Sequence, residues 1–427
     1  WVLKIRWLSP ITDLVVGQTQ RSRNYLMRDG ALEPRPGLSQ STQTSNPMGV
    51  AVTGGVEVVS SNGTYYPLIS GTTRFAYHDG LGWSVLSYVS ANGSSTPPSG
   101  TSRQYYDFTQ IYHAPVDDNL AVMGCESYET LLCWRSGTTI FSTLTGAPRA
   151  KFVTAFDNFV LAFNVRDVGS AQSRYVQRVQ WSERGSATTW TGGNTGFEDL
   201  LDAKGSGTKI LSQEQRILLF FEDEIWQGVR APFPNIFRFT PLDRSVGSPY
   251  SKTIVDTPVG TIFLGRDYMF YLLPTDGGKA QAISRGIHRQ LRNYVVPERA
   301  WSVYDEFQNS YQFYYMPVGV PNPILAFYLN LADFSYAEQT IEGNSARQLT
   351  FGFSAYQQTS TAGLTWDEAS ALGYIWDSIA GTWDAYAQIP TLGKRTVFAG
   401  SSTGTMYYFN SRTTRDDGDA ILCWWMS

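Results

Sequence analysis

The stretch "RILLFFEDEIWQGV", residues 216–229, places two apolar and aromatic runs on either side of the acidic pair Glu222-Asp223. Each run has the length and composition of a strand, and a charged pair between two such runs is typical of a tight turn. The stretch therefore predicts a β-hairpin. Six further stretches have the same form, and we expect their turns at Asp79-Gly80, Asp157-Asn158, Arg266-Asp267, Asn309, Ala332-Asp333 and Thr403-Gly404.

The spacing of some predicted turns indicates a repeat. The interval from Glu222 to Arg266 is 44 residues and the interval from Arg266 to Asn309 is 43. A four-stranded propeller blade needs about 40–50 residues. The interval from Asp157 to Glu222 is 65 residues, so insertions must intervene. We expect an all-β fold, a β-propeller-like body of four-stranded antiparallel blades with inserted loops, and a double β-sandwich is the alternative.

The composition of the 427-residue chain fits this fold class. Aromatic residues make up 14% and charged residues only 16%, and there are 39 Gly and 20 Pro. This mixture favours many short strands joined by tight turns, and it argues against coiled coils, helical bundles and disorder.

We divide the chain into three parts. Residues 1–40 are expected to pack on the body as a strand and turn segment, residues 41–410 to form the propeller-like body, and residues 411–427 to begin a further β element. The chain starts without Met, and both of its ends look like strand. We therefore expect a trimmed or processed chain.

A Trp-rich insertion is expected at about 360–390, where "TWDEASALGYIWDSIAGTWDAYA" repeats Trp-Asp at Trp366, Trp376 and Trp383. In the propeller family named for this dipeptide it recurs about every 40–45 residues, so intervals of ten and seven argue against that family. We expect the three indole rings to anchor a loop between two blades or against a neighbouring subunit. The intramolecular version is preferred, because three exposed indoles would promote aggregation.

Charge and cysteine content narrow the class of protein. The formal net charge of -4 argues against a generally basic, nucleic-acid-gripping surface. Three cysteines, Cys125, Cys133 and Cys423, form no disulfide framework and suit assembly in a reducing cytoplasm. No apolar run approaches the ~18 residues that a membrane-spanning segment needs.

The sequence contains no convincing enzyme site. "KGSGTKI" (204–210) lacks the order of a phosphate-binding loop, and "WSERGSATTW" (181–190) has Arg184 where the Asp-box of sialidase propellers has Asp. "RDDGDA" (415–420) predicts a hairpin turn rather than a calcium loop. The histidines, His78, His113 and His288, have no partner at metal-ligand spacing. We predict no catalytic residue, no cofactor and no metal site.

Several stretches, taken in order, resemble the β-propeller tail nozzle (tail hub, tail tubular) proteins of short-tailed, podovirus-type phages. The resemblance extends over about residues 20–410 and is carried by "NYLMRDGALEPRPGL", "VQWSERGSATTWTGG", "DLLDAKGSGTKILSQEQRILLFFEDEIWQ" and "RFTPLDRSVGSPYSKTIVDTPVGTIFLGRDYMFYLL". Clustered Thr-Trp-Asp units also occur in proteins of this kind. In the first stretch, Arg35-Pro36-Gly37 predicts a rigid turn, because Pro fixes φ and Gly permits a left-handed exit.

The resemblance implies a structural protein of the virion tail, assembled in the host cytoplasm. Its subunits would form a cyclic, hexameric nozzle ring around the DNA exit channel. The ring would join head-to-tail adaptor or portal-side proteins to tail needle, plug or fibre proteins, and genomic DNA would pass through without sequence-specific binding. Such proteins lack a catalytic centre, so the residues we single out are structural anchors: Trp366, Trp376, Trp383, Arg35, Pro36 and Gly37.

Two other classes of protein stay open. A carbohydrate-binding or glycan-cleaving receptor-recognition propeller would use the aromatic surplus to stack on sugars. A cellular scaffold propeller would bind peptides on one face. Assembly into a ring favours the nozzle, glycan binding by a monomer or trimer favours the second class, and capture of a cellular partner favours the third.

Overall fold

The computed structural model describes residues 21–28, 31–41, 47–79, 82–89, 105–125, 130–166, 174–232, 235–284, 291–292, 296–316, 325–332, 334, 336–341, 348–356, 395–410 and 415–426. These residues form β-strands joined by turns and by short 3-10 helices, which are η2 (Ala114–Val116), η3 (Ser251–Thr253) and η4 (Pro297–Arg299).

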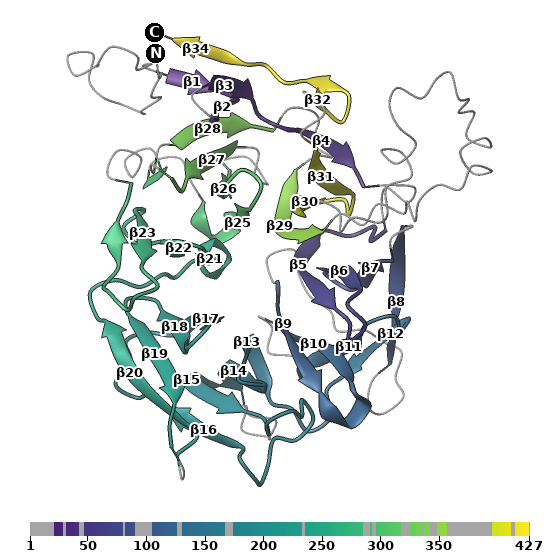
Figure 1. Cartoon of the computed structure of the whole chain (residues 1–427), viewed down its shortest axis with the longest axis vertical. Coiled ribbons are helices and arrows are strands. Elements are labelled where there is room, and N and C mark those ends of the chain that lie inside the picture. Colours follow the sequence, from purple (N-terminus) through teal and green to yellow (C-terminus); the bar gives the residue numbers. More distant parts are fainter. Residues whose placement is uncertain are drawn as a thin grey trace.

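Within the described residues the strands form seven four-stranded antiparallel blades arranged in a ring (Figure 1). The fourth strands of the first two blades also pair in parallel, so these two blades form one eight-stranded sheet. Blades 1 to 3 comprise β5 (Val52–Val59), β6 (Tyr65–Gly71), β7 (Phe75–His78) and β8 (Trp83–Val89); β9 (Tyr106–His113), β10 (Asp118–Cys125), β11 (Leu132–Arg135) and β12 (Ile140–Thr143); and β13 (Arg149–Phe156), β14 (Phe159–Arg166), β15 (Arg174–Trp181) and β16 (Gly196–Asp199).

Blades 4 to 6 follow in the same order. They comprise β17 (Gly207–Gln213), β18 (Arg216–Phe221), β19 (Ile225–Arg230) and β20 (Phe237–Asp243); β21 (Val255–Thr257), β22 (Gly260–Leu264), β23 (Phe270–Leu273) and β24 (Gln281–Ala282); and β25 (Trp301–Asp305), β26 (Ser310–Tyr315), β27 (Leu325–Asn330) and β28 (Tyr336–Thr340). Figure 1 shows the first strand of each blade toward the centre of the ring and the fourth at its rim.

Blade 7 takes its fourth strand from the other end of the chain, and this closes the ring. It comprises β29 (Leu349–Tyr356), β30 (Arg395–Ser401), β31 (Met406–Asn410) and β4 (Gly37–Gln40). The register of β4 against β31 pairs Leu38 with Phe409 and Gln40 with Tyr407. An early strand therefore locks the last blade by ordinary ladder hydrogen bonds.

The remaining strands extend this closure. β1 (Arg21–Arg23) lies parallel to β28 at the edge of blade 6, and β34 (Trp424–Met426) pairs antiparallel with β1. β2 (Tyr25–Arg28) and β3 (Ala31–Pro34) form one hairpin, and β32 (Arg415–Asp416) and β33 (Asp419–Ala420) form another. Both ends of the described chain thus lie together beside blades 6 and 7 (Figure 1).

The all-β, propeller-like fold and the seven hairpins predicted from the sequence are confirmed. The strands on either side of each predicted turn are paired and antiparallel, as at β18 and β19 around Glu222-Asp223. Gly80 and Asp333, which belong to two of these turns, lie outside the described residues. One of the two intervals that were interpreted as a blade repeat does not measure one. The turns at Glu222 and Arg266 both join the second and third strands of their blades, but the turn at Asn309 joins the first and second strands of blade 6. The interval of 43 residues therefore compares unlike turns.

Large aromatic side chains fill the wedges between successive blades. Between blades 3 and 4, Phe163 meets Phe221 edge-on with ring centroids 5.4 Å apart, and Trp181 meets Phe237 at 5.2 Å. Gly207 at the start of β17 leaves room for Phe163, because a Cβ there would lie 2.3 Å from its ring. Edge-to-face ring contacts of this kind stabilise the packing beyond their buried area.

Because consecutive strands are antiparallel, the connections divide between two faces of the ring. The loops between blades and the turns between second and third strands lie on one face, which we call the linker face. The turns between first and second strands and between third and fourth strands lie on the opposite face, which we call the turn face. One pocket of the propeller opens on each of these faces.

Candidate functional site at the centre and closure of the propeller

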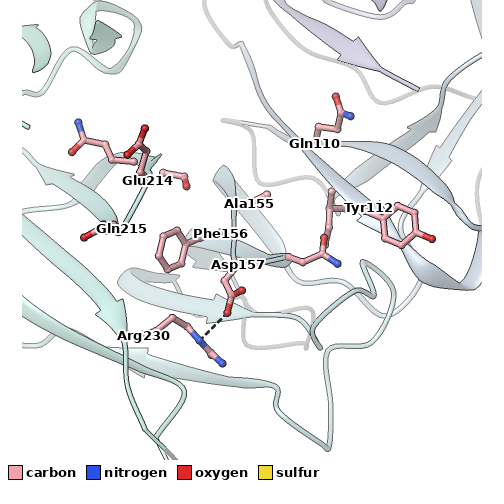
Figure 2. Close-up of a pocket in the computed structure, with 12 residues that line it drawn as sticks. Gln110, Tyr112, Ala155, Phe156, Asp157, Glu214, Gln215 and Arg230 are labelled. Carbon is pink, nitrogen blue, oxygen red and sulfur yellow. Dashed lines mark ion pairs between the residues drawn. The ribbon is translucent and has the colours of Figure 1, made fainter. Parts of the chain in front are cut away.

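A pocket of about 680 Å³ opens on the turn face between blades 2, 3 and 4. Its walls come from the end of β9, the β13–β14 turn and the β17–β18 turn (Figure 2). Phe156 contributes an apolar surface, and Asp157, Glu214, Gln215 and Arg230 contribute polar groups. Openings at the centre of a rigid scaffold are where ligand sites most often form, so this pocket is the first candidate.

The Asp157 carboxylate is held by guanidinium groups from two blades. Arg184, in the loop after β15, donates to it at 2.7 Å. Arg230, at the end of β19, forms an ion pair with it at 3.0 Å (Figure 2). The Arg230 guanidinium also lies over the Phe159 ring, 4.8 Å from its centroid. Asp157 and Asn158 both have positive φ, 48° and 60°, as a two-residue hairpin turn requires. These contacts fix Asp157 as a link between blades 3 and 4.

Two amides near this pocket link further blades. Gln110 donates to the Val59 carbonyl at 2.6 Å and accepts from the Val59 N–H at 2.9 Å, which joins blade 2 to blade 1. Gln213 donates to Asp256 at 2.9 Å and to the Thr261 hydroxyl at 3.1 Å, which joins blade 4 to blade 5. The polar wall therefore consists largely of groups that hold neighbouring blades together.

A second pocket, of about 510 Å³, opens on the linker face. Tyr105, Tyr250, Lys252 and Arg299 line it. The Tyr105 hydroxyl, from the chain just before blade 2, hydrogen-bonds the Ser251 hydroxyl, from the loop before blade 5. Lys252 Nζ lies 4.6 Å from the centroid of the Tyr105 ring. Burial raises the pKa of Tyr250, so its phenol stays neutral at physiological pH.

Asp107 makes two further contacts between blades near the centre of the ring. Asp107, two residues along from Tyr105, accepts a hydrogen bond from the Lys209 ammonium on the first strand of blade 4. Its other oxygen accepts the Val153 N–H of blade 3 at 3.0 Å. Side chains of blades 2, 3, 4 and 5 thus meet near the centre of the ring.

The third candidate is the buried contact that joins the two ends of the chain, which we call the clasp. Arg35 forms a bidentate pair with Asp416, with Nη1 to Oδ1 at 2.9 Å and Nη2 bonded to Oδ2, and neither side chain has exposed surface. Arg35 also donates to the carbonyls of Thr340 at 2.5 Å and Pro36 at 2.9 Å, and to Asn24 Oδ1 at 3.4 Å. Every branch of the guanidinium is therefore occupied.

Asn24 completes the clasp. It has a φ of 64°, a conformation that Asn tolerates better than most residues. Its side-chain amide donates to Thr340 Oγ1 and to the Leu422 carbonyl, both at 2.8 Å. Burial by itself lowers the pKa of Arg35, but the hydrogen bond and charge of Asp416 raise it above the ordinary value. The clasp is an ionised pair that joins the N-terminal segment, blade 6 and the C-terminal segment.

The predicted rigid turn at Arg35-Pro36-Gly37 is wrong. Arg35 and Pro36 connect β3 to β4 in extended chain, and Gly37 is the first residue of a strand and does not take the left-handed conformation. Gly37 is small for another reason. A Cβ there would lie 2.1 Å from the backbone oxygen of Arg415. Pairing with β31 and burial of Arg35 override the local turn preference of Pro-Gly.

Asp416 is the functional partner that sequence reasoning missed. The hairpin predicted at 415–420 is confirmed as β32 and β33, but its first acid is buried in the clasp and not on the surface. No local signal could have found the pair, because 381 residues separate Arg35 from Asp416.

The remaining predicted anchors, Trp366, Trp376 and Trp383, lie outside the described residues. The strands on either side of that segment, β29 and β30, are paired neighbours within one blade. His288 also lies outside the described residues. His113 is buried and its Nδ1 accepts the Ala187 N–H at 3.1 Å, and burial lowers its pKa.

Within the described residues, no group of three or more His, Cys, Asp or Glu side chains is placed to hold a metal ion. No helix in them has the length and apolar character needed to cross a membrane.

Comparison with known proteins gives fold-level likenesses alone. No family model matches the chain, and no curated protein sequence matches it. Among solved structures, the computationally designed Ika8 protein is 9% identical over 85% of this chain and 97% of its own, with a TM-score of 0.39. The extracellular domain of a putative one-component system from B. thetaiotaomicron is 7% identical over 84% of this chain and 38% of its own, with a TM-score of 0.45.

An ancestral GH74 enzyme is 12% identical over 86% of this chain and 45% of its own, with a TM-score of 0.46. The chain thus spans less than half the length of each of the last two structures. At these identities and TM-scores, none of the three likenesses assigns a function to this chain.

Proposed function

We propose that this chain is a structural protein of the tail of a short-tailed phage. Six subunits form a nozzle ring around the DNA exit channel and join the portal or adaptor side to the distal tail. The observation that carries the proposal is that the stretches resembling tail nozzle proteins fall on the joints of the propeller. They lie where a rigid ring has to be held together.

The first stretch holds the clasp, through Arg35. The second holds the loop after β15, where Trp181 Nε1 donates to the Asn194 carbonyl at 3.0 Å and Trp190 Nε1 donates to the Ala187 carbonyl at 2.7 Å. Both indoles are buried. An indole that is buried and hydrogen-bonded at its nitrogen fixes a loop in one position.

The last stretch holds the link between blades 4 and 5. A Cβ on Gly247 would lie 2.4 Å from both the Phe221 carbonyl oxygen and the Glu224 N–H nitrogen, so the loop packs directly on the β18–β19 turn. The Ser248 N–H donates to the same Phe221 carbonyl at 3.0 Å. A scaffold that transmits load between neighbours uses such joints, whereas a catalytic site needs reactive groups in an accessible place.

The contacts that cross the centre of the propeller bear on where the genome would pass. Because Tyr105 and Ser251 meet across the ring, and Asp107 pairs with Lys209, DNA does not thread one propeller in this proposal. The channel is instead the axis of the six-subunit ring. The mildly acidic chain, with a net charge of -4, would let phosphates slide past without strong attachment.

The proposal includes no catalytic activity. The pocket carboxylate Asp157 is occupied by two guanidinium groups, and both pockets are walled by groups that link blades. The expected partners are adaptor or portal-side proteins on one side of the ring and needle, plug or fibre proteins on the other. Trp, Tyr and Arg are the residues expected to carry most of the binding free energy at those contacts.

Native mass spectrometry of the purified chain tests the proposal. We expect a species of six copies that persists on dilution into the micromolar range. A trimer would contradict the nozzle and support a receptor-recognition propeller, and a glycan array would then follow. A monomer at every concentration tested would also contradict it.

A further inference from the structure

Among the described residues, the two faces of the propeller carry an excess of opposite charge. The exposed basic residues of the linker face come from loops of blades 1, 3, 4 and 5 and outnumber its exposed acids, which are Asp202, Asp267 and Glu298. Glu222 and Asp223, in the β18–β19 turn of the same face, pair with Arg266 at 2.8 and 3.2 Å and reduce this excess without reversing it. These basic residues are Arg74, Arg174, Lys204, Arg244, Arg266 and Arg292. Lys252 and Arg299, half-buried around the pocket on the same face, add to the positive side.

The turn face has the reverse composition. Its exposed acids come from the turns of blades 1, 2, 4, 5 and 6, and they are Asp79, Asp117, Glu214, Asp256, Asp276 and Glu306. Three of its exposed cations are neutralised within the face: Arg184 and Arg230 form ion pairs with Asp157, and Arg135 pairs with Asp118 at 2.9 Å. Lys279 is also exposed there, in the β23–β24 turn, and the acids still exceed the cations.

The separation follows from the topology and not from the overall charge. The net charge of the chain is only -4, yet alternate connections place an excess of exposed acids on one side and an excess of exposed cations on the other. Charges on opposite sides of a rigid body cannot neutralise each other at close range, because screening at physiological salt limits their interaction to about 8 Å. Each face therefore presents its own sign to an approaching molecule.

We propose that the linker face of one copy docks on the turn face of the next, and that this head-to-tail contact closes the ring. The inference rests on the proposed function, because it supplies the contact between the six subunits. The charges favour a second copy of this chain as the partner, because each copy carries an excess of positive charge on one face and an excess of negative charge on the other. Repetition of such a heterologous contact gives a closed ring when the rotation per step fits. Complementary potentials also speed correct association and disfavour face-to-face errors.

The test uses two double variants with reversed charges. Lys204→Glu/Arg244→Glu makes the linker face acidic, and Glu214→Lys/Asp276→Lys makes the turn face basic. Lys204 and Arg244 are exposed on the loops that follow blades 3 and 4, and Glu214 and Asp276 are exposed at turns of blades 4 and 5. In each variant alone both faces carry the same sign, so we expect the fraction of hexamer at about 0.15 M salt to fall tenfold or more.

Mixing the two variants should restore the ring. Each contact then joins faces of opposite sign, and a six-membered ring permits strict alternation of the two variants. We expect native mass spectrometry to show hexamers with three copies of each. Glu33→Lys is the control, because it reverses an exposed charge on the β2–β3 hairpin, away from both faces. It should leave the hexamer intact.

The outcomes separate this inference from the proposed function. A wild-type hexamer that survives both double variants would overturn the face-to-face contact and leave the nozzle ring standing. Loss of the hexamer in both variants without rescue on mixing would also overturn it. A wild-type chain that stays monomeric at low salt, with no carbodiimide cross-link between Lys204 and the acids of another copy, would overturn both.

Discussion

Among single residues, Arg35 has the largest consequence for the fold. A guanidinium without exposed surface is tolerable only when every donor is used and an opposite charge lies against it. Asp416, Thr340, Pro36 and Asn24 meet that requirement from separate parts of the chain. The clasp therefore depends on one side chain that connects both ends of the protein.

We predict that Arg35→Met lowers the free energy of unfolding by about 3–5 kcal/mol, because it leaves the Asp416 carboxylate buried and without its charge partner. Urea denaturation followed by tryptophan fluorescence measures this. The matched control is Arg135→Met, which removes the partner of Asp118. Arg135 is 48% exposed, and Asp118 keeps the N–H groups of Ser61 and Asn119, so we expect a loss of about 0–1 kcal/mol.

A double variant, Arg35→Met/Asp416→Leu, separates charge burial from simple loss of packing. It removes both charges together, so it should be more stable than Arg35→Met alone. If Arg35→Met lowered the free energy of unfolding no more than Arg135→Met does, the clasp would stabilise the protein no more than an exposed ion pair.

The sequence could show that Arg35 stands in an unusual segment but not what it does there. Its neighbours Pro36 and Gly37 have strong local preferences, which predicted a turn. The true constraint is a carboxylate 381 residues away, and no periodicity or spacing in one sequence encodes such a pair. For the same reason Asp416 was interpreted as a turn residue.

Among the elements, the hairpins were the most predictable. In "RILLFFEDEIWQGV" both strands and their turn are local, so propensity and turn chemistry suffice to predict them. The position of a hairpin within its blade is not local. The turn at Asn309 joins the first and second strands of its blade, and the turn at Arg266 joins the second and third strands of its blade. The two turns look alike in sequence. The sequence therefore predicted the blades but not their number or boundaries.

The strand that closes blade 7 was beyond sequence reasoning. β4 has four residues and pairs with β31, which lies at the other end of the chain. Its first residue packs against the β32–β33 hairpin, where the Arg415 backbone leaves no space for a Cβ on Gly37.

We predict that Gly37→Ala lowers the free energy of unfolding by about 1–3 kcal/mol, since the backbone of either β4 or β32 must shift. Differential scanning calorimetry measures the change. Gly278→Ala is the control, because the nearest atom to its added Cβ is a side-chain oxygen of Asp276 at 3.3 Å. A variant at Gly37 as stable as the one at Gly278 would contradict the placement of β4 against β32.

At the scale of the whole molecule, three features support a role as a rigid scaffold. The ring is closed by strands from both ends of the chain, contacts between blades 2 and 5 cross its centre, and its two faces differ in charge. A ring of blades that is closed by strands from both chain ends and by a buried ion pair resists deformation without any moving part. A nozzle subunit must hold its shape while the genome passes beside it.

The measurement that tests this account most directly is a three-dimensional electron cryomicroscopy map of the purified protein. The account predicts six seven-bladed propellers around an open axis, with density that joins blades 2 and 5 across the centre of each propeller. Isolated propellers, a trimer, or a ring whose only passage runs through the centre of a propeller would contradict it.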